Sequence, residues 1–152
     1  MGRASEAEQL IPELRRREQT WIGHDLNSRA LHGELMVWIG DFAHALEELS
    51  EVYRNTKDWR MPVSYAGAPD NLAEIVSITQ AQLRAMTSLS ALAMQLGNDT
   101  LARDWANAAE ARYNDVVYVV NHWIYGIVMP GHYDIYYGRA INQSVKAAAL
   151  SD

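Results

Sequence analysis

One histidine and several carboxylates lie at helical spacing in the first half of the chain, which raises the question of a metal site. Asp41 and His44 are three residues apart, with Glu34 before them and Glu48 after them. Di-iron carboxylate bundles use Glu-x-x-His pairs on two helices and one glutamate from each of two others. No second pair of this kind occurs, and helical spacing turns Asp41, His44 and Glu48 away from the apolar residues around them. We therefore expect a solvated acidic surface and no metal.

A second candidate for chemistry is His122, which lies inside the most apolar segment of the chain, 116–129. It is expected to be a hydrogen-bonded core residue. The alternative is that His122, Trp105 and Trp123 line a pocket between two helices, a common place for an aromatic or hydrophobic ligand. No serine has a Gly-x-Ser-x-Gly setting and no glycine-rich phosphate loop is present, so we assign no catalytic residue and no cofactor.

The aromatic residues point to association more than to catalysis. The chain has eight tyrosines and five tryptophans against one phenylalanine. Tyrosine and tryptophan combine an apolar body with a polar group, and they are enriched at protein interfaces. Six of the eight tyrosines lie in the C-terminal third, where we predict an interface formed by Tyr118, Trp123, Tyr125, Tyr133, Tyr136 and Tyr137. Intramolecular packing of these residues is the alternative.

Composition excludes several classes of protein. The 152 residues carry a net charge of −6, which disfavours nucleic acid as a partner. The absence of cysteine excludes disulfides and thiolate metal sites. The longest apolar segment has 14 residues, whereas a membrane-spanning helix needs about 20. With no secretory signal region near the start, we expect a cytoplasmic protein, or one carried in an assembly made in the cytoplasm.

Apolar periodicity and capping residues predict an all-α fold, an antiparallel bundle of four to five helices in a single domain, 1–152. Gly97 is predicted to end one long helix and Asn98 to begin the next. The valine-rich segment 116–120 favours a strand by propensity, but no second strand exists to pair with it, so we predict helix. The predicted helices are 6–20, 26–54, 70–96, 101–125 and 139–150.

The predicted helix 26–54 has the clearest pattern. One face of it, expected to be buried, carries Leu31, Leu35, Trp38, Phe42, Leu46, Leu49 and Tyr53. Gly33 and Gly40 are seven residues apart, so they share one side of such a helix and would admit a neighbouring helix closely.

The predicted helix 70–96 is unusual in its lack of charge. Between Ile75 and Asn98, Arg84 is the one charged residue. A helix of this kind rarely faces water over half its circumference, so it is either central in the bundle or packed against another chain.

These features together favour a non-enzymatic structural or interaction subunit that self-associates or packs into a larger assembly, such as a virion or a bacterial complex. The first alternative is a small helical enzyme or ligand-binding protein that uses the pocket near Trp105. The second is an inhibitor with an acidic helix surface, which would consist of Glu34, Asp41, Glu47, Glu48 and Glu51.

Overall fold

The computed structural model describes residues 6, 9–10, 12, 22–59 and 72–123. Within them lie four helices, which are α2 (Ile22–Ile39), α3 (Phe42–Thr56), α4 (Leu72–Gln95) and α5 (Asp99–Trp123). These described segments contain no strand, and the packing of the four helices confirms the predicted all-α bundle. The predicted helix 139–150 lies outside the described residues, as does most of 6–20.

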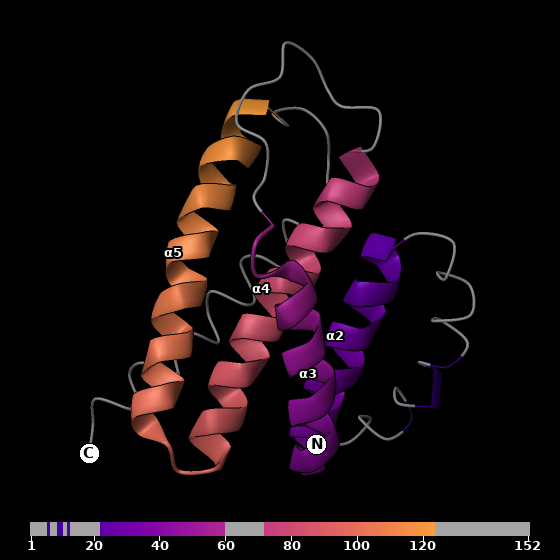
Figure 1. Cartoon of the computed structure of the whole chain (residues 1–152), viewed down its shortest axis with the longest axis vertical. Helices are drawn as coiled ribbons and strands as arrows, with labels where there is room; N and C mark the ends of the chain where they lie inside the picture. The colour runs from indigo at the N-terminus through magenta and orange to yellow at the C-terminus, as the bar shows by residue number, and fades with distance from the viewer. Residues whose placement is uncertain (1–5, 7–8, 11, 13–21, 60–71, 124–152) are drawn as a thin grey trace.

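Successive helices run antiparallel, and two of the connections meet at one end of the molecule (Figure 1). The α2–α3 turn and the α4–α5 turn both lie at the bottom of that view, and we call this end the turn end. Because the direction alternates along the chain, α2 and α4 are parallel neighbours. Their contacts advance together, from Asn27 with Gln80 to Glu34 with Arg84.

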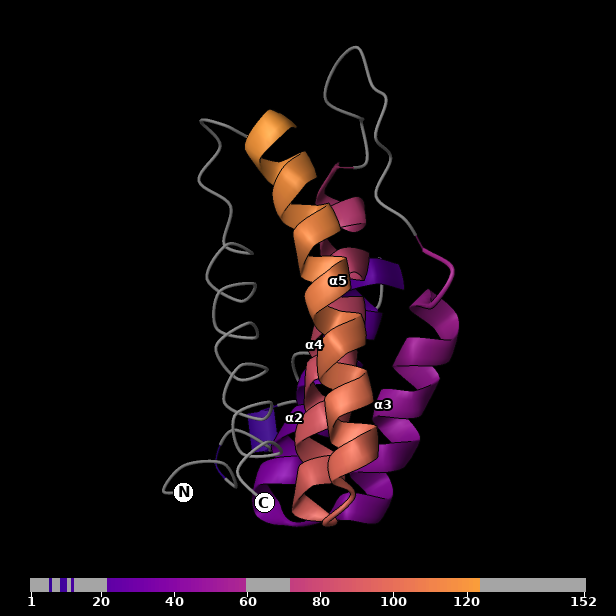
Figure 2. The same cartoon turned by 90° about the vertical axis from the view of Figure 1, so that its left-hand side faces the viewer.

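The fourth helix of the predicted set, α5, extends without interruption through the valine-rich segment 116–120 to Trp123. The helix prediction is therefore confirmed over strand propensity. Figure 2 shows α5 passing in front of α4 along most of its length.

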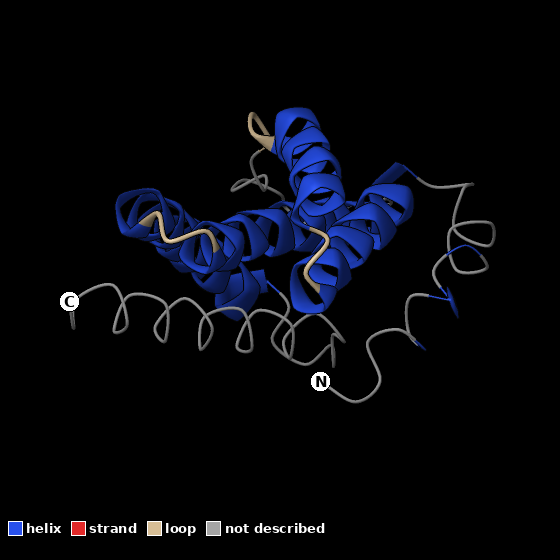
Figure 3. Ribbon diagram, turned by 90° about the horizontal axis from the view of Figure 1, so that it is seen from below, coloured by secondary structure: helices blue, strands red, loops and turns tan. Residues whose placement is uncertain are grey.

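Helix α4 is the centre of the bundle, since it packs against α2, α3 and α5. Figure 3, viewed from the turn end, shows α5 on the left and α2 and α3 on the right. Every residue of 85–90 is buried, and Arg84 is only partly exposed. The lack of charge in this helix therefore reflects a central position within its own chain, which is the first of the two alternatives.

The prediction of one continuous helix over 26–54 is wrong, because the chain turns at Gly40. Gly40 has φ of +89°, and the N–H groups of Gly40 and Asp41 both donate to the carbonyl of Met36. The Gly40 N–H also donates to Val37. This is the Schellman arrangement, in which a left-handed glycine satisfies the last carbonyls of a helix.

The α4–α5 turn repeats the same design. Gly97 has φ of +72°, its N–H donates to Met94, and the N–H of Asn98 donates to Ala93. The Asn98 side chain then accepts a hydrogen bond from the N–H of Leu101 at 3.1 Å, which caps α5. This end and this beginning agree with the sequence prediction.

The break at Gly40 also changes which residues are buried. Among the seven residues of the predicted face, only Leu49 is buried, while Trp38 and Leu46 are exposed. The two helices fold back on each other, so each one buries its own face instead of continuing a shared stripe. The buried positions with helical spacing are Leu26, Ala30, Gly33 and Val37 in α2, and Ala45, Leu49, Val52 and Thr56 in α3.

The two glycines of the predicted pair have different roles. A Cβ atom at Gly33 would lie 2.6 Å from Cγ of Leu49, so this glycine is what allows α3 to approach α2. The close approach predicted at Gly33 is confirmed, and the neighbour is the second half of the supposed single helix. At Gly40 a Cβ atom would meet nothing within 4 Å, because this residue forms the turn.

None of the helices in the described residues combines the length and the apolar character that crossing a membrane requires.

Candidate functional site

The surface between α3 and α5, with α4 as its floor, changes in character along its length. At the end away from the turns it is closed by polar groups. Gln82 donates to the Thr56 carbonyl at 2.6 Å and accepts from Arg112 Nε at 2.6 Å. Arg112 Nη2 also donates to the Trp59 carbonyl at 3.3 Å, and the Trp59 indole donates to Thr79. These hydrogen bonds join α3, α4 and α5 through buried side chains.

Halfway along, α3 and α5 meet through an aromatic contact. The rings of Tyr53 and Trp105 are 4.7 Å apart between centroids and nearly perpendicular. Edge-to-face contacts of this kind stabilise a packed pair beyond the area that they bury. Trp105 packs here against the α2–α3–α4 core. His122 and Trp123 belong to α5, but their side chains lie outside the described set, so the pocket predicted around these three residues stays a prediction.

At the turn end the residues of this surface include exposed leucines. Gln82 forms hydrogen bonds with both Thr56 of α3 and Arg112 of α5, so these two residues lie at one level of the bundle. Leu46 is ten residues before Thr56 and Leu101 is eleven before Arg112, so the two leucines also lie at about one level, nearer the turn end. Leu46 is seven residues before Tyr53 and Leu101 is four before Trp105, so both lie on the helix sides that carry the aromatic pair. Leu96 directly follows α4, in the α4–α5 turn at the same end of the bundle. We call Leu46, Leu96 and Leu101 the open groove end.

These three leucines are well exposed for their type. The exposed fractions are 51% for Leu46, 57% for Leu96 and 44% for Leu101. A single exposed leucine needs no explanation, but a group of them at one place marks an interaction site in many proteins. The sequence pattern missed this site because it counted Leu46 among the buried residues of a continuous helix.

Acidic residues outnumber basic ones near the starts of α3 and α5. At the start of α3 stand Asp41 and Glu47, and at the start of α5 stand Asp99 and Asp104, with Arg103 as the arginine among them. His44 belongs to the same turn. Its Nδ1 lies 2.6 Å from Oδ2 of Asp41, whose other oxygen accepts from the His44 N–H at 3.4 Å.

The contact between Asp41 and His44 shifts the pKa values of both side chains. The hydrogen bond that the Asp41 carboxylate accepts from the ring raises the pKa of His44 above its ordinary 6.5, and the same bond lowers the pKa of Asp41 below 3.8. The His44 contribution to stability is therefore present below about pH 6.5 and is lost as pH rises through the higher folded pKa. The Asp41 contribution is present above about pH 4 and is lost as pH falls.

We accordingly expect the variant His44→Gln to lower the melting temperature most at about pH 5, where both groups are charged in the folded chain. The loss should be small, because both side chains face water. Asp41→Asn keeps a capping side chain without its charge, so it is expected to show the same pH profile. Melting curves recorded from pH 4 to pH 9 test this, and a loss that is equal at every pH would contradict it.

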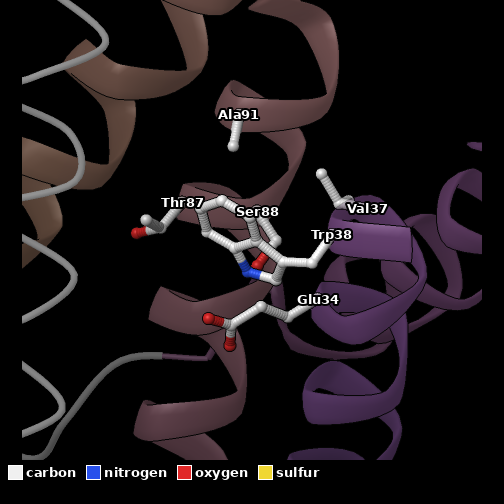
Figure 4. A pocket seen from close by; sticks show the side chains of 6 residues that line it. All are labelled: Glu34, Val37, Trp38, Thr87, Ser88 and Ala91. Carbon is white, nitrogen blue, oxygen red and sulfur yellow. The ribbon is translucent and has the colours of Figure 1, made fainter. Parts of the chain in front are cut away.

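The opposite surface, between α2 and α4, carries an ion pair and a shallow depression (Figure 4). Glu34 of α2 pairs with Arg84 of α4, and both side chains are mostly buried. The Trp38 indole lies over α4, between Glu34 and the side chains of Ser88 and Ala91. What remains open has room for about one water molecule. This depression is too small for an organic ligand.

The expected solvated acidic surface is only partly correct. Glu48 forms an ion pair with Arg29 at 3.3 Å and lies 3.3 Å from His32, and Arg29 also pairs with Glu51 at 2.6 Å. Like Glu34, Glu48 is mostly buried, so these glutamates join helices instead of facing water. The described residues contain no group of three or more possible metal ligands.

The predicted aromatic interface falls mostly outside the described side chains. Tyr118 and Trp123 are part of α5, and their side chains are not described. The remaining members lie outside the described residues, and they are Tyr125, Tyr133, Tyr136 and Tyr137. This interface therefore stays a prediction.

One tyrosine of the C-terminal third is described, and it belongs to the core. Tyr113 is buried, and its hydroxyl lies 2.7 Å from Oγ1 of Thr87 on α4. Burial raises the pKa of this phenol to about 12. Tyr113 therefore stays neutral in the physiological range and acts as a link between α4 and α5.

Comparison with known proteins adds no relative: no family model, no curated protein and no solved structure matches this chain.

Proposed function

We propose that this chain is a non-enzymatic helical subunit that acts by associating with other protein chains, either copies of itself or other members of a larger assembly. The proposal rests on one observation, which is the open groove end. Leu46, Leu96 and Leu101 are exposed at the end of the bundle where both turns lie.

Two further features support the choice of this surface. The rest of the α3–α5 surface is closed, by the hydrogen bonds of Arg112 and by the ring contact of Trp105. The two Schellman turns hold the helix ends, so the apolar side chains are carried on ordered elements. A surface prepared in this way loses little conformational entropy when it binds.

Helix α4 does not support this proposal. Its lack of charge is explained by packing against three helices of its own chain. The exposed leucines provide the remaining support in the described residues, and the valine-rich half of α5 stays an expectation from the sequence.

The test is the mass of the purified protein over a range of concentrations. If the chain associates with itself through the open groove end, light scattering after size exclusion should give a mass above 17.1 kDa that rises with concentration. The double variant Leu46→Ser/Leu101→Ser should shift the mass toward the monomer while keeping the helical circular dichroism signal. A monomer at high micromolar concentration would contradict self-association, leaving only a different chain as partner.

A further inference from the structure

We infer that two copies of this chain exchange helix α2, with the turn at Gly40 straightening so that α2 and α3 become one continuous helix. In such a dimer α2 of one copy packs against α3 and α4 of the other. This inference rests on the proposed function and deepens it, because it names a second copy as the partner and α2 as the exchanged element. Exchange of an identical element is a low-cost route to a dimer.

The α2–α3 turn can straighten without losing backbone hydrogen bonds. In a continuous helix the N–H of Gly40 keeps its bond to the Met36 carbonyl, and the N–H of Asp41 moves from Met36 to Val37. The N–H of His44 exchanges the Asp41 side chain for the Gly40 carbonyl. The two backbones therefore differ mainly in the conformation of Gly40, which has φ of +89° in the turn.

The apolar spacing of the sequence suits the continuous helix. At about 100° per residue, the seven residues of the predicted face lie within roughly 80° on one side of it. Asp41 and Glu47 lie outside that side. In the folded chain the same seven residues are divided between two helices, where only Leu49 is buried and Trp38 and Leu46 are exposed.

Exchange also brings together the apolar side chains of the turn end. The two bundles of such a dimer are joined through Gly40, so their turn ends face each other. The large apolar residues exposed at this end of the single chain then lie near the two-fold axis, and they are Trp38, Leu46, Leu96 and Leu101. The dimer therefore buries apolar surface that one copy leaves in water.

The contacts that hold α2 within one chain can all form between two copies. Gly33 of one copy would lie against Leu49 of the other, and Arg29 would pair with Glu48 and Glu51 across the copies. The core of each bundle is then unchanged, and the area buried between the turn ends is the gain.

Gly40→Ala is the direct test. Alanine is strained at φ of +89° and is the best helix former, so it disfavours the turn and favours the continuous helix. We expect a shift of about tenfold or more in each chain, and so of about a hundredfold in the dissociation constant of a dimer. Samples are refolded from denaturant at high concentration, because α2 must leave its own bundle to exchange, and light scattering after size exclusion gives the mass.

Gly97→Ala is the matched control. Gly97 forms the same kind of turn with φ of +72°, and a Cβ atom there would also meet nothing within 4 Å. In a helix continued through Gly97, however, Leu89 and Ala93 lie on nearly the opposite side from Trp105 and Ala109. This variant should lose stability without gaining mass.

Ala43→Pro keeps the turn and blocks the continuous helix. Ala43 is exposed in the first turn of α3, where a backbone N–H has no partner within the helix, so proline is tolerated there. In a continuous helix the same proline is interior and removes the hydrogen bond to Ile39. Gly40→Ala/Ala43→Pro should be monomeric at concentrations where Gly40→Ala is a dimer, with circular dichroism showing that both are helical.

The outcomes separate this inference from the proposed function. A Gly40→Ala variant no more dimeric than Gly97→Ala would overturn the inference, and so would a Gly40→Ala dimer that persists when Ala43→Pro is added. If the wild type associates through Leu46 and Leu101 and Ala43→Pro leaves its mass unchanged, the inference fails and the proposed function stands. If the wild type and Gly40→Ala are both monomeric at high micromolar concentration, the inference and self-association both fail.

Discussion

Replacing Leu49 by alanine is expected to lower the free energy of unfolding by about 2–5 kcal/mol, the range for a leucine removed from a packed core. Leu49 is fully buried and belongs to the main core cluster, where α3 meets α2. Its side chain lies against Gly33, so its removal opens a cavity at the closest approach of the two helices. Denaturant unfolding followed by circular dichroism measures the loss.

A double variant of Gly33 and Leu49 tests their contact more directly than a single substitution does. Gly33→Ala places a methyl group 2.6 Å from Leu49 Cγ, an overlap that costs about 1–3 kcal/mol and offsets the helix propensity gained. In the double variant Gly33→Ala/Leu49→Ala the new methyl group enters the space that Leu49 leaves. The double variant should therefore lose less than the sum of the single losses. Additive losses would show that the two residues are not in contact.

Arg112→Met is expected to lower the free energy of unfolding by about 3 kcal/mol, because each hydrogen bond to a charged group contributes about 1.5–3 kcal/mol. Arg112 is only 7% exposed, and its guanidinium joins Gln82 to the Trp59 carbonyl. Methionine fills similar space but donates no hydrogen bond, so the Gln82 carbonyl oxygen loses its donor. Thermal and denaturant unfolding test the prediction.

A matched cycle distinguishes the hydrogen bond from packing. Gln82→Leu removes the acceptor, and the combination Arg112→Met/Gln82→Leu replaces both partners by apolar groups. Because the cost arises mainly from an unsatisfied buried group, the double variant should be less destabilised than the sum of the single variants. Equal stability of Arg112→Met and wild type would show that the guanidinium contributes nothing to the bundle.

These two sites bear on function because they fix the positions of α3 and α5 in the bundle. The Gly33–Leu49 contact fixes α3 against α2, and Arg112 fixes α5 against the end of α3. Leu46 and Leu101 are carried by those same helices. A variant that weakens either site is therefore expected to affect association indirectly, so the Leu46→Ser/Leu101→Ser variant should be compared with wild type in stability as well as in mass.

The sequence determined the helical class and several of its details by local chemistry. Helix periodicity is local, and so are glycine at a helix end and asparagine at a helix start. Hence the turn at Gly97 and Asn98 was predictable, as was the presence of helix over 116–120. The near absence of charge in α4 predicted either a central position in the bundle or packing against another chain. The structure shows the central position.

Tertiary structure decided the rest. Gly40 and Asp41 form the same type of turn as Gly97 and Asn98, yet the apolar spacing continues across Gly40 as in an unbroken helix. The local pattern allowed either an unbroken helix or a turn at Gly40. The long-range packing of α3 against α2 favours the turn. That choice exposed Leu46 and buried Glu48, because burial depends on what lies opposite a side chain, and neighbours along the chain do not specify it.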